Sequence, residues 1–445
     1  MVLAALHNYA GGRRYYIYSY GCWMNFHDSE KYAGLLETAG FTRAHSSRDA
    51  DLLLFNTCCV CRNVEIQAES DLRKAGDSNA ELVIVCGCLT QQKSAAARIS
   101  RDFPFVRIIF GTGGMERLHE RMYDAVVKCI PVTKFDDTGL QPEGLPIRRT
   151  SPVSAHVSIM NGCDCHCAYC VVPFVRGRAI YRGAQEILAE INGLQQRDYR
   201  EITLLGQNVA SYRDNTGVSF TKLLRLAADT GMARIGFYTA HPRDVSRELL
   251  EIMARTPALE KHIHLPVESG SNAVLKAMNR GYTREEYLEI VDSFYQLMPD
   301  GCISTDAMVG FPGETEADFM ETVSLFQGVG FTYAYIFAFS PREKTAAAAM
   351  KQLDVTVKQE RFLRLAAAHH ETAARKLAGF AGKVERVLSE ELQPGESRLM
   401  TGKTSGGIEV TFCGTPELTG RFVNVLITSS DERGLRGKVV TMESS

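Results

Sequence analysis

Long apolar runs, an excess of one charge and an export signal are all missing from this sequence of 445 residues. No stretch approaches the roughly 18 consecutive apolar residues of a membrane span, so we expect no membrane association. The 50 Lys and Arg residues and 52 Asp and Glu residues give a net charge of −2. This balance excludes a globally basic nucleic-acid binder but allows local basic patches. The first residues place their arginines after a short apolar stretch, the reverse of a secretory signal, and we therefore expect a cytoplasmic protein.

Cysteine, in contrast, is abundant, with 13 residues in the chain. Because the sequence has no recognisable export signal, disulfides are not expected. Clustered cysteines in such a protein favour metal ligation or catalysis, whereas isolated cysteines are usually small buried hydrophobes. We interpret four as isolated: Cys86, Cys129, Cys302 and Cys413.

The N-terminal third of the chain alternates apolar runs with helical patterns. In residues 14–128 the apolar runs fall at 14–20, 51–55, 81–86 and 106–110, and one helix is expected at 28–39 with Asp28 and Ser29 as N-caps. This alternation predicts a doubly wound α/β domain with a parallel sheet. The segment that follows, up to residue 154, contains four prolines and few apolar runs, and we expect it to be a linker.

The remaining chain predicts two further domains. Residues 150–378 repeat the β–α alternation, with strands expected at 155–160, 201–205, 233–238, 262–266, 302–309 and 333–339. A complete (β/α)₈ barrel usually needs about 250 residues, so this shorter segment predicts a partial (β/α)₆ barrel. In residues 379–443, short β-type runs separated by Gly, Pro, Ser and Asp predict a small antiparallel β-barrel.

The densest cysteine cluster is the sequence GCDCHCAYC at residues 162–170. Two spacings compete in it: Cys163 with Cys167 and Cys170 forms C-x₃-C-x₂-C, and Cys165 in place of Cys163 forms C-x-C-x₂-C. Three thiolates in one tight loop suit an iron–sulfur cluster, and three ligands leave one iron open, as a catalytic metal requires. A zinc site is the alternative, but no second cysteine pair lies at finger spacing.

A second set of cysteines is dispersed along the N-terminal domain. Cys22, Cys58 and Cys88 each follow a predicted strand. The carboxyl ends of parallel strands face one crevice, where ligands bind, so these three thiols are expected to converge. Three unrelated buried thiols remain the alternative interpretation.

Residues 163–170 resemble the signature loop of radical S-adenosylmethionine (SAM) enzymes. The sequences YGCWMN (20–25), NTC (56–58) and GCLTQ (87–91) resemble the N-terminal domain of the methylthiotransferases within that class. The resemblance continues through LLGQNV (204–209), HLPV (264–267), MNRGYT (278–283) and VGFPGETE (309–316), and it covers about residues 14–442. It is closest to the branch that acts on isopentenylated adenosine in tRNA. The C-terminal segment resembles a TRAM domain, an RNA-binding module.

The resemblance implies cofactors and ligands for both cysteine sets. A [4Fe–4S] cluster that binds SAM at its open iron would be held by Cys163, Cys167 and Cys170. An auxiliary cluster, [4Fe–4S] or [3Fe–4S], that carries the sulfur to be inserted would be held by Cys22, Cys58 and Cys88. The loops that face the cofactor are expected to use Gln207, Asn208, Glu268, Ser269 and Asp306. No residue is assigned as catalytic.

The resemblance also implies a reaction. SAM would be both methyl donor and radical source for insertion of a methylthio group at C2 of N6-isopentenyladenosine at position 37, beside the anticodon. The expected partners are isopentenylated tRNA, an electron donor such as flavodoxin or ferredoxin, and an iron–sulfur or sulfur carrier, and we expect a monomer. Two alternatives stay open: a methylthiotransferase for threonylcarbamoyl-adenosine in tRNA or for a ribosomal protein, and an RNA-binding scaffold with structural clusters.

Several residues depart from the family pattern. Trp23, the only tryptophan, stands where the family usually has Gln, and a buried aromatic and a substrate-stacking role are equally favoured. Cys59 and Cys61 replace Ser and Arg, and we interpret them as inert thiols rather than spare ligands; Cys165 is left unligated. Glu268 stands where Gln is usual.

Basic residues near the loop and in the C-terminal segment are candidates for RNA binding. Arginines just after the cysteine loop suit phosphate or carboxylate contacts, with a solvated basic face as the alternative. The residues concerned are Arg176, Arg178, Arg182, Lys383, Arg386, Lys403 and Arg421.

Overall fold

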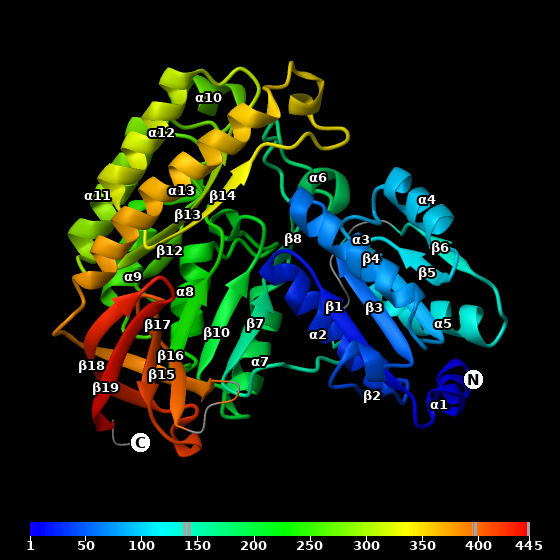
Figure 1. The fold of residues 1–445 in the computed structure, drawn as a ribbon. Helices are drawn as coiled ribbons and strands as arrows, with labels where there is room; N and C mark the ends of the chain where they lie inside the picture. The colour runs from blue at the N-terminus through cyan, green and yellow to red at the C-terminus, as the bar shows by residue number, and fades with distance from the viewer. Residues whose placement is uncertain (137–138, 140–143, 394, 396–397, 443–445) are drawn as a thin grey trace.

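The computed structural model describes residues 1–136, 139, 144–393, 395 and 398–442. Figure 1 shows an N-terminal α/β domain on one side of a central α/β domain, with a small β-barrel packed at the lower end of the central strands. Among the described helices, none is long and apolar enough to cross a membrane.

The N-terminal domain contains a six-stranded, all-parallel sheet in the order β2-β1-β3-β4-β5-β6. Its strands are β1 (Arg14–Ser19), β2 (Thr42–Arg43), β3 (Leu52–Thr57), β4 (Leu82–Gly87), β5 (Val106–Phe110) and β6 (Val132–Lys134). One face packs on α1 (Val2–Ala10), α2 (Trp23–Thr38) and α5 (Leu118–Val126). The other face packs on α3 (Arg62–Gly76) and α4 (Lys93–Asp102). The doubly wound fold is therefore confirmed, and the wholly apolar core of β3 and β4 follows from burial on both faces.

Two local predictions for this domain were wrong. Helix α2 begins at Trp23 with Cys22 as its N-cap, so Asp28 and Ser29 lie inside the helix and are buried. The apparent cap residues have other partners there, since the Ser29 hydroxyl accepts a hydrogen bond from Ser19. The segment expected to be only a linker also contributes β6, which pairs with β5. A three-residue edge strand with one buried side chain leaves too little pattern to predict it.

The central domain has six parallel strands in two adjoining three-stranded sheets. They are β7 (Ser154–Ser158), β10 (Glu201–Leu205) and β11 (Arg234–Phe237), then β12 (His262–His264), β13 (Cys302–Val309) and β14 (Tyr333–Ala338). Between β11 and β12 the ladder narrows to a single bridge, Ile235 to Leu259. This is the expected partial (β/α)₆ barrel.

Helices cover the outside of the central strands (Figure 1). The long ones are α7 (Ala184–Gln195), α8 (Phe220–Ala228), α9 (Arg247–Arg255), α11 (Arg284–Leu297), α12 (Glu316–Val329) and α13 (Val355–Ala378). Shorter elements are α6 (Val172–Val175), α10 (Asn272–Ala277) and the hairpin of β8 (Met160–Asn161) with β9 (Ile180–Tyr181). Alternate strand residues such as Val157, Ile202 and Ile263 belong to the apolar layer under these helices. Their neighbours, including His156 and His264, face the other way, so the inner face of the barrel is polar and aromatic.

The C-terminal domain is a closed five-stranded barrel in the order β15-β16-β17-β19-β18. Its strands are β15 (Val384–Leu392), β16 (Leu399–Thr404), β17 (Glu409–Cys413), β18 (Phe422–Asp431) and β19 (Gly434–Met442). The expectation of a wholly antiparallel barrel needs one correction, because β17 and β19 pair in parallel. The barrel is anchored to β11, since Arg234 Nη1 donates to the carbonyl oxygens of Lys403 at 2.8 Å and Thr404 at 3.0 Å.

Candidate active site

Cys22, Cys58 and Cys88 lie in the turns that follow β1, β3 and β4, which are adjacent strands of the sheet. Strand order reverses between β1 and β3, and ligands bind at such a switch point in open α/β sheets. The three thiols interact: burial, together with the thiols of Cys22 and Cys88, raises the pKa of Cys58 to about 12. The structure thus brings together the three cysteines that the sequence places on separate strands.

Asn25, in the first turn of α2, connects the turns that carry these cysteines. Its Nδ2 donates to the carbonyl oxygens of Tyr20 at 2.8 Å and Thr57 at 3.1 Å. Its Oδ1 lies 3.9 Å from Cys88 Sγ. Because one amide contacts all three turns, it fixes their relative positions. The sequence indicates Asn25 only as part of the YGCWMN motif and assigns it no role.

Glycine is required where the first two turns meet. Gly21 has φ +93°, and a Cβ atom there would lie 2.5 Å from Cys58 Sγ. A larger residue would therefore displace the thiol as well as strain the backbone.

Arg176 reaches this cysteine set from the central domain. It is buried, and its Nη2 donates to Asn25 Oδ1 at 2.7 Å and to Asp28 Oδ2 at 2.8 Å. A hydrogen bond with Cys59 and the nearby Arg176 guanidinium lower the pKa of Cys88 to about 6. Cys59 is fully buried beside Cys88, and donating that hydrogen bond raises its own pKa. The expectation that Arg176 contacts RNA is therefore wrong.

Of the two other arginines after the cysteine loop, one is buried and one is exposed. Arg182 is also buried, and its Nη1 donates to the carbonyl oxygen of Ser158 and to Glu190 Oε2. It therefore contributes to packing within the central domain, against the expected RNA contact. Arg178 is 91% exposed, with its Nε 3.3 Å from Asp164 Oδ1, and remains available to a large partner.

The cysteine loop 163–170 lies at the carboxyl end of the first barrel strand, as predicted. Cys163 and Cys165 are in contact, with the Cys165 backbone N–H 3.4 Å from Cys163 Sγ. A hydrogen bond from Cys163 and the nearby Arg243 lower the pKa of Cys165 to about 6. Burial and the Cys167 thiol raise the pKa of Cys170 to about 12. The four thiols of the loop are therefore neighbours, and neither predicted spacing is excluded.

Arg280 is the main residue of this site that the sequence does not indicate by itself. It is buried, and its Nη1 lies 3.5 Å from Cys167 Sγ and 3.3 Å from the Tyr169 hydroxyl. Its Nη2 donates to the Pro266 carbonyl oxygen at 2.9 Å. Burial raises the pKa of Glu268 to about 7, although Arg280 opposes this. The MNRGYT motif contains Arg280, but its approach to a cysteine depends on tertiary folding.

The five residues expected to face SAM fall into two groups. The first is Gln207, Glu268 and Asp306, and the second is Asn208 and Ser269. Glu268 and Asp306 lie near each other, since Glu268 N donates to the Asp306 carbonyl oxygen at 2.9 Å, and the Asp306 side chain is 27% exposed. Gln207 Oε1 is buried and has no hydrogen-bond partner among the described residues.

The second group is occupied by internal hydrogen bonds. Asn208 donates to Asp244 Oδ2 at 2.6 Å and accepts from the backbone of His241. Ser269 is fully buried, with its hydroxyl 3.3 Å from that of Thr322. These two residues shape the loops rather than present free polar groups.

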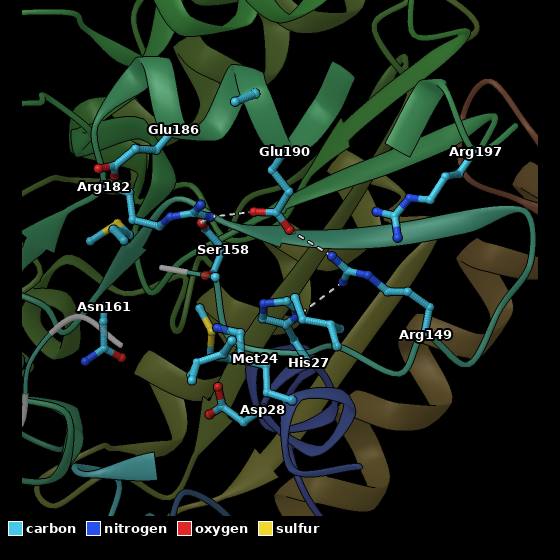
Figure 2. A pocket seen from close by; sticks show the side chains of 16 residues that line it. Met24, His27, Asp28, Arg149, Ser158, Asn161, Arg182, Glu186, Glu190 and Arg197 are labelled. Atoms are coloured by element: carbon cyan, nitrogen blue, oxygen red, sulfur yellow. Dashed lines mark hydrogen bonds and ion pairs between the residues drawn. The ribbon is translucent and has the colours of Figure 1, made fainter. Parts of the chain in front are cut away.

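A cavity of about 480 Å³ lies between α2 and the central domain. Figure 2 shows charged side chains around it, three of which are paired: Glu190 accepts from Arg149 at 2.8 Å and from Arg182 at 2.9 Å. All six predicted cysteine ligands are described, and none of them lines this cavity. The cavity therefore belongs to the interdomain contact rather than to the cysteine sites.

The two donor sets fit iron–sulfur clusters. Each consists of thiols, the usual ligands of such clusters, and each has a buried arginine, Arg176 or Arg280, whose charge offsets that of thiolates. Among the described residues, no group of three or more His, Cys, Asp or Glu side chains is arranged around a single metal ion.

Two family models match the chain. The Radical SAM superfamily model matches residues 157–326, and the model described as Uncharacterized protein family UPF0004 matches residues 14–111. Among solved structures, the radical S-adenosylmethionine methyltransferase TsrM from Kitasatospora setae aligns with a TM-score of 0.54 and 14% identity over 76% of this chain and 75% of that one. That likeness concerns the fold alone.

Curated relatives match almost the whole chain. It is 41% identical over 435 residues to the tRNA-2-methylthio-N(6)-dimethylallyladenosine synthase of Thermoanaerobacter sp. (strain X514), covering 96% of this chain and 92% of the relative. The synthase of that name from Caldicellulosiruptor saccharolyticus is 40% identical over 437 residues, 96% and 93% of the two chains. That from Clostridium perfringens (strain SM101 / Type A) is 39% identical over 445 residues, 98% and 99%.

The fold and the cysteine loop define a radical SAM enzyme, a class that uses a [4Fe–4S] cluster and SAM. The curated relatives match both cysteine-bearing domains and the C-terminal barrel, and this similarity identifies one family within that class. The chain belongs to the family of tRNA-2-methylthio-N(6)-dimethylallyladenosine synthases.

Proposed function

We propose that this enzyme inserts a methylthio group at C2 of N6-isopentenyladenosine at position 37 of tRNA, with SAM as methyl donor and radical source. The observation that carries the proposal is the 41% identity over 96% of the chain, which includes both cysteine sets. When bound, a [4Fe–4S] cluster supplies the electron that cleaves SAM, and an auxiliary cluster supplies sulfur.

The ligand assignment follows the two cysteine sets. The radical cluster is held by Cys163, Cys167 and Cys170, and the auxiliary cluster by Cys22, Cys58 and Cys88. Arg280 and Arg176 donate N–H groups near these thiols and stabilise their negative charge. Gln207 and Asp306 face SAM, because Gln207 carries an unpartnered buried oxygen and Asp306 a partly exposed carboxylate. Glu268 joins them because its backbone N–H is bonded to the Asp306 carbonyl oxygen. Asn208 and Ser269 hold the loops in place.

The C-terminal barrel provides part of the RNA-binding surface. Its exposed basic residues include Arg421 and Lys383, although Lys383 Nζ lies 2.9 Å from Asp300 Oδ1. Arg386 lies with its guanidinium carbon 3.7 Å from the centre of the Phe422 ring. Lys403 is less available, because it is only partly exposed and its Nζ lies 3.1 Å from Glu390 Oε1. Phosphate contacts release counterions, so tRNA binding should weaken steeply with salt. Cys302 of the central domain packs in the core of this barrel, so deletion of residues 380–445 would also disturb the central domain. The double variant Arg386→Gln with Arg421→Gln is therefore a cleaner test of RNA binding.

The organisation and partners proposed for the chain follow from the same family. The functional units are residues 14–128 with the auxiliary cluster, 150–378 with the radical cluster, and 379–443 for RNA. The enzyme is a cytoplasmic monomer that receives electrons from a flavodoxin or ferredoxin and sulfur or clusters from a carrier.

The test is a comparison of substrates. The cluster-loaded enzyme, SAM and a reductant are incubated with unmodified, isopentenylated or threonylcarbamoylated tRNA, or with ribosomal protein, and the products are measured by mass spectrometry. Methylthio product is expected chiefly from isopentenylated tRNA. Preference for threonylcarbamoylated tRNA or ribosomal protein would overturn the proposal, and absence of SAM cleavage would favour a scaffold with structural clusters.

A further inference from the structure

Trp23 lies at the boundary between the two cysteine-bearing domains. It is the first residue of α2, directly after Cys22, and it is 44% exposed. Its ring centre lies 5.3 Å from that of His156 on β7 and 6.2 Å from that of Tyr238, which follows β11. Trp23 therefore does not belong to the N-terminal core. It extends to the inner face of the central barrel.

An aromatic row continues from Trp23 across that inner face. Tyr238 stacks on His264, with ring centres 5.1 Å apart and an angle of 27°. His264 meets Tyr335 edge-on at 6.0 Å, and Tyr335 is 46% exposed. His264 Nε2 lies 3.3 Å from Asp306 Oδ2. The row thus runs from the auxiliary cysteine set to a carboxylate proposed to face SAM.

Polar groups of this row interact within the row. The hydroxyl of Tyr238 lies close to the side chains of Trp23 and Tyr335, and burial with the neighbouring Tyr335 raises the pKa of Tyr238. His264 is bonded through both ring nitrogens, to Ser304 Oγ at 2.9 Å and to Asp306. Because both ring nitrogens of His264 are bonded, the two exposed aromatic rings, Trp23 and Tyr335, are what the row offers to a ligand. Exposed ring faces favour stacking with a planar, uncharged π-system such as a nucleobase.

We infer that the indole of Trp23 is the stacking surface for the purine of the acceptor adenosine, and that it helps to select that nucleoside. The inference rests on the proposed function, in which sulfur passes from the auxiliary site to C2 of this purine. The purine must then lie beside Cys22, and Trp23 is the next residue in the chain. Stacking there would place the base between the auxiliary set and the aromatic row that leads to Asp306.

The test compares two anticodon stem-loop RNAs that differ at one position. One carries N6-isopentenyladenosine at position 37, and the other carries an abasic site there. Fluorescence anisotropy of end-labelled RNA measures the Kd of the cluster-loaded enzyme under anaerobic conditions. Loss of one stacked base is expected to weaken binding about tenfold in the wild type.

The variants separate stacking from a structural role. Trp23→Leu should reduce the tenfold difference to less than about twofold, because it removes the ring, whereas Trp23→Phe should keep most of it. The matched control is Phe135→Leu, an exposed aromatic after the outermost strand β6, which should keep the full difference. Iron content and melting temperature show whether each variant folds. If Trp23→Leu still distinguishes the two RNAs as well as the wild type, or if Trp23→Phe loses the distinction completely, the inference is wrong.

A second measurement uses the fact that Trp23 is the only tryptophan in the chain. Its emission should be quenched by the isopentenylated stem-loop and changed little by the abasic one, because stacking on a base quenches the indole directly. Equal responses to both RNAs would overturn the inference. The proposed function is tested apart from this: if the wild type makes methylthio product but its emission does not distinguish the RNAs, only the role of Trp23 fails. If no product forms from any substrate, the proposed function fails.

Discussion

The two cysteine sites are built in opposite ways. The radical set comes from one loop of eight residues, 163–170, and its thiols are partly exposed. The auxiliary set comes from three turns separated by 36 and 30 residues of sequence, and two of its thiols, Cys58 and Cys88, are buried. The first site is therefore defined by local chain geometry, and the second depends on the parallel sheet bringing β1, β3 and β4 together.

This difference determines what each site needs from the rest of the molecule. The loop takes its charged contacts from its own domain, where Arg280 Nη1 lies near Cys167 and Arg243 Nη2 lies near Cys165. The auxiliary set needs Asn25 to connect its turns and Arg176 from the other domain to provide positive charge. We infer that damage to domain packing affects the auxiliary site first, while damage to the loop affects only the radical site.

The largest effect is expected from removing the radical set. Replacing Cys163, Cys167 and Cys170 together with Ala should remove about half of the roughly eight irons of a protein with two four-iron clusters. SAM cleavage and methylthio insertion should both fall below detection, because the cluster that reduces SAM has lost its ligands. Iron analysis and assay of 5′-deoxyadenosine measure this. Loss of all the iron, or of none, would contradict two independent sites.

Removing the auxiliary set should have a narrower effect. The triple variant Cys22→Ala, Cys58→Ala and Cys88→Ala should lose the other half of the iron and all methylthio product. Cleavage of SAM to 5′-deoxyadenosine should remain measurable, because the loop folds without those turns. If cleavage disappears while the iron of the radical cluster remains, the separation of the two roles is wrong.

The sequence predicts these two sites unequally for a physical reason. The loop and its spacing are visible in nine consecutive letters, and the strands that carry Cys22, Cys58 and Cys88 are visible as apolar runs. Arg176 is misread because two further arginines, Arg178 and Arg182, follow it closely in the sequence, whereas its partners, Asn25 and Asp28, are about 150 residues away. The start of α2 and the strand β6 are missed for the opposite reason, since their local signals are weak and tertiary packing decides them.

A third prediction concerns the contact that holds the two domains together. Glu30 on α2 accepts hydrogen bonds from the backbone and hydroxyl of Thr150 and pairs with Arg149 at 3.2 Å. Burial opposes ionisation, but these bonds and His27 lower the pKa of Glu30 to about 2, from an ordinary 4.5. Such a difference corresponds to about 3 kcal/mol of stability at neutral pH. Glu30→Gln should lose a large part of it, as measured by urea unfolding at pH 7.

The pH dependence gives the sign of this effect. The contribution of Glu30 is fully present above about pH 4.5 and is lost as the pH falls toward 2, because its pKa is lower in the folded state. The difference in stability between wild type and Glu30→Gln should therefore shrink over that window. The control is Glu371→Gln, which breaks an exposed pair with Arg375 on α13 and should cost less than about 0.5 kcal/mol. A Glu30→Gln effect no larger than that of the control would show that this contact does not hold the domains together.

The smallest effects are expected from the three additional cysteines beside the two sites. Cys59 is buried against Cys88, Cys61 is the N-cap of α3, and Cys165 lies between Cys163 and Arg243, with Arg243 Nη2 3.6 Å from its sulfur. Serine is close in size to cysteine and can keep these hydrogen bonds but is a poor ligand for iron. Cys59→Ser, Cys61→Ser and Cys165→Ser should therefore each keep both clusters, measured as about eight irons per chain.

Cys163→Ser is the matched control for Cys165→Ser, because the two thiols are in contact and belong to the competing spacings. Retention of iron in Cys163→Ser with loss in Cys165→Ser would establish C-x-C-x₂-C as the ligand spacing and would move Cys165 into the radical set.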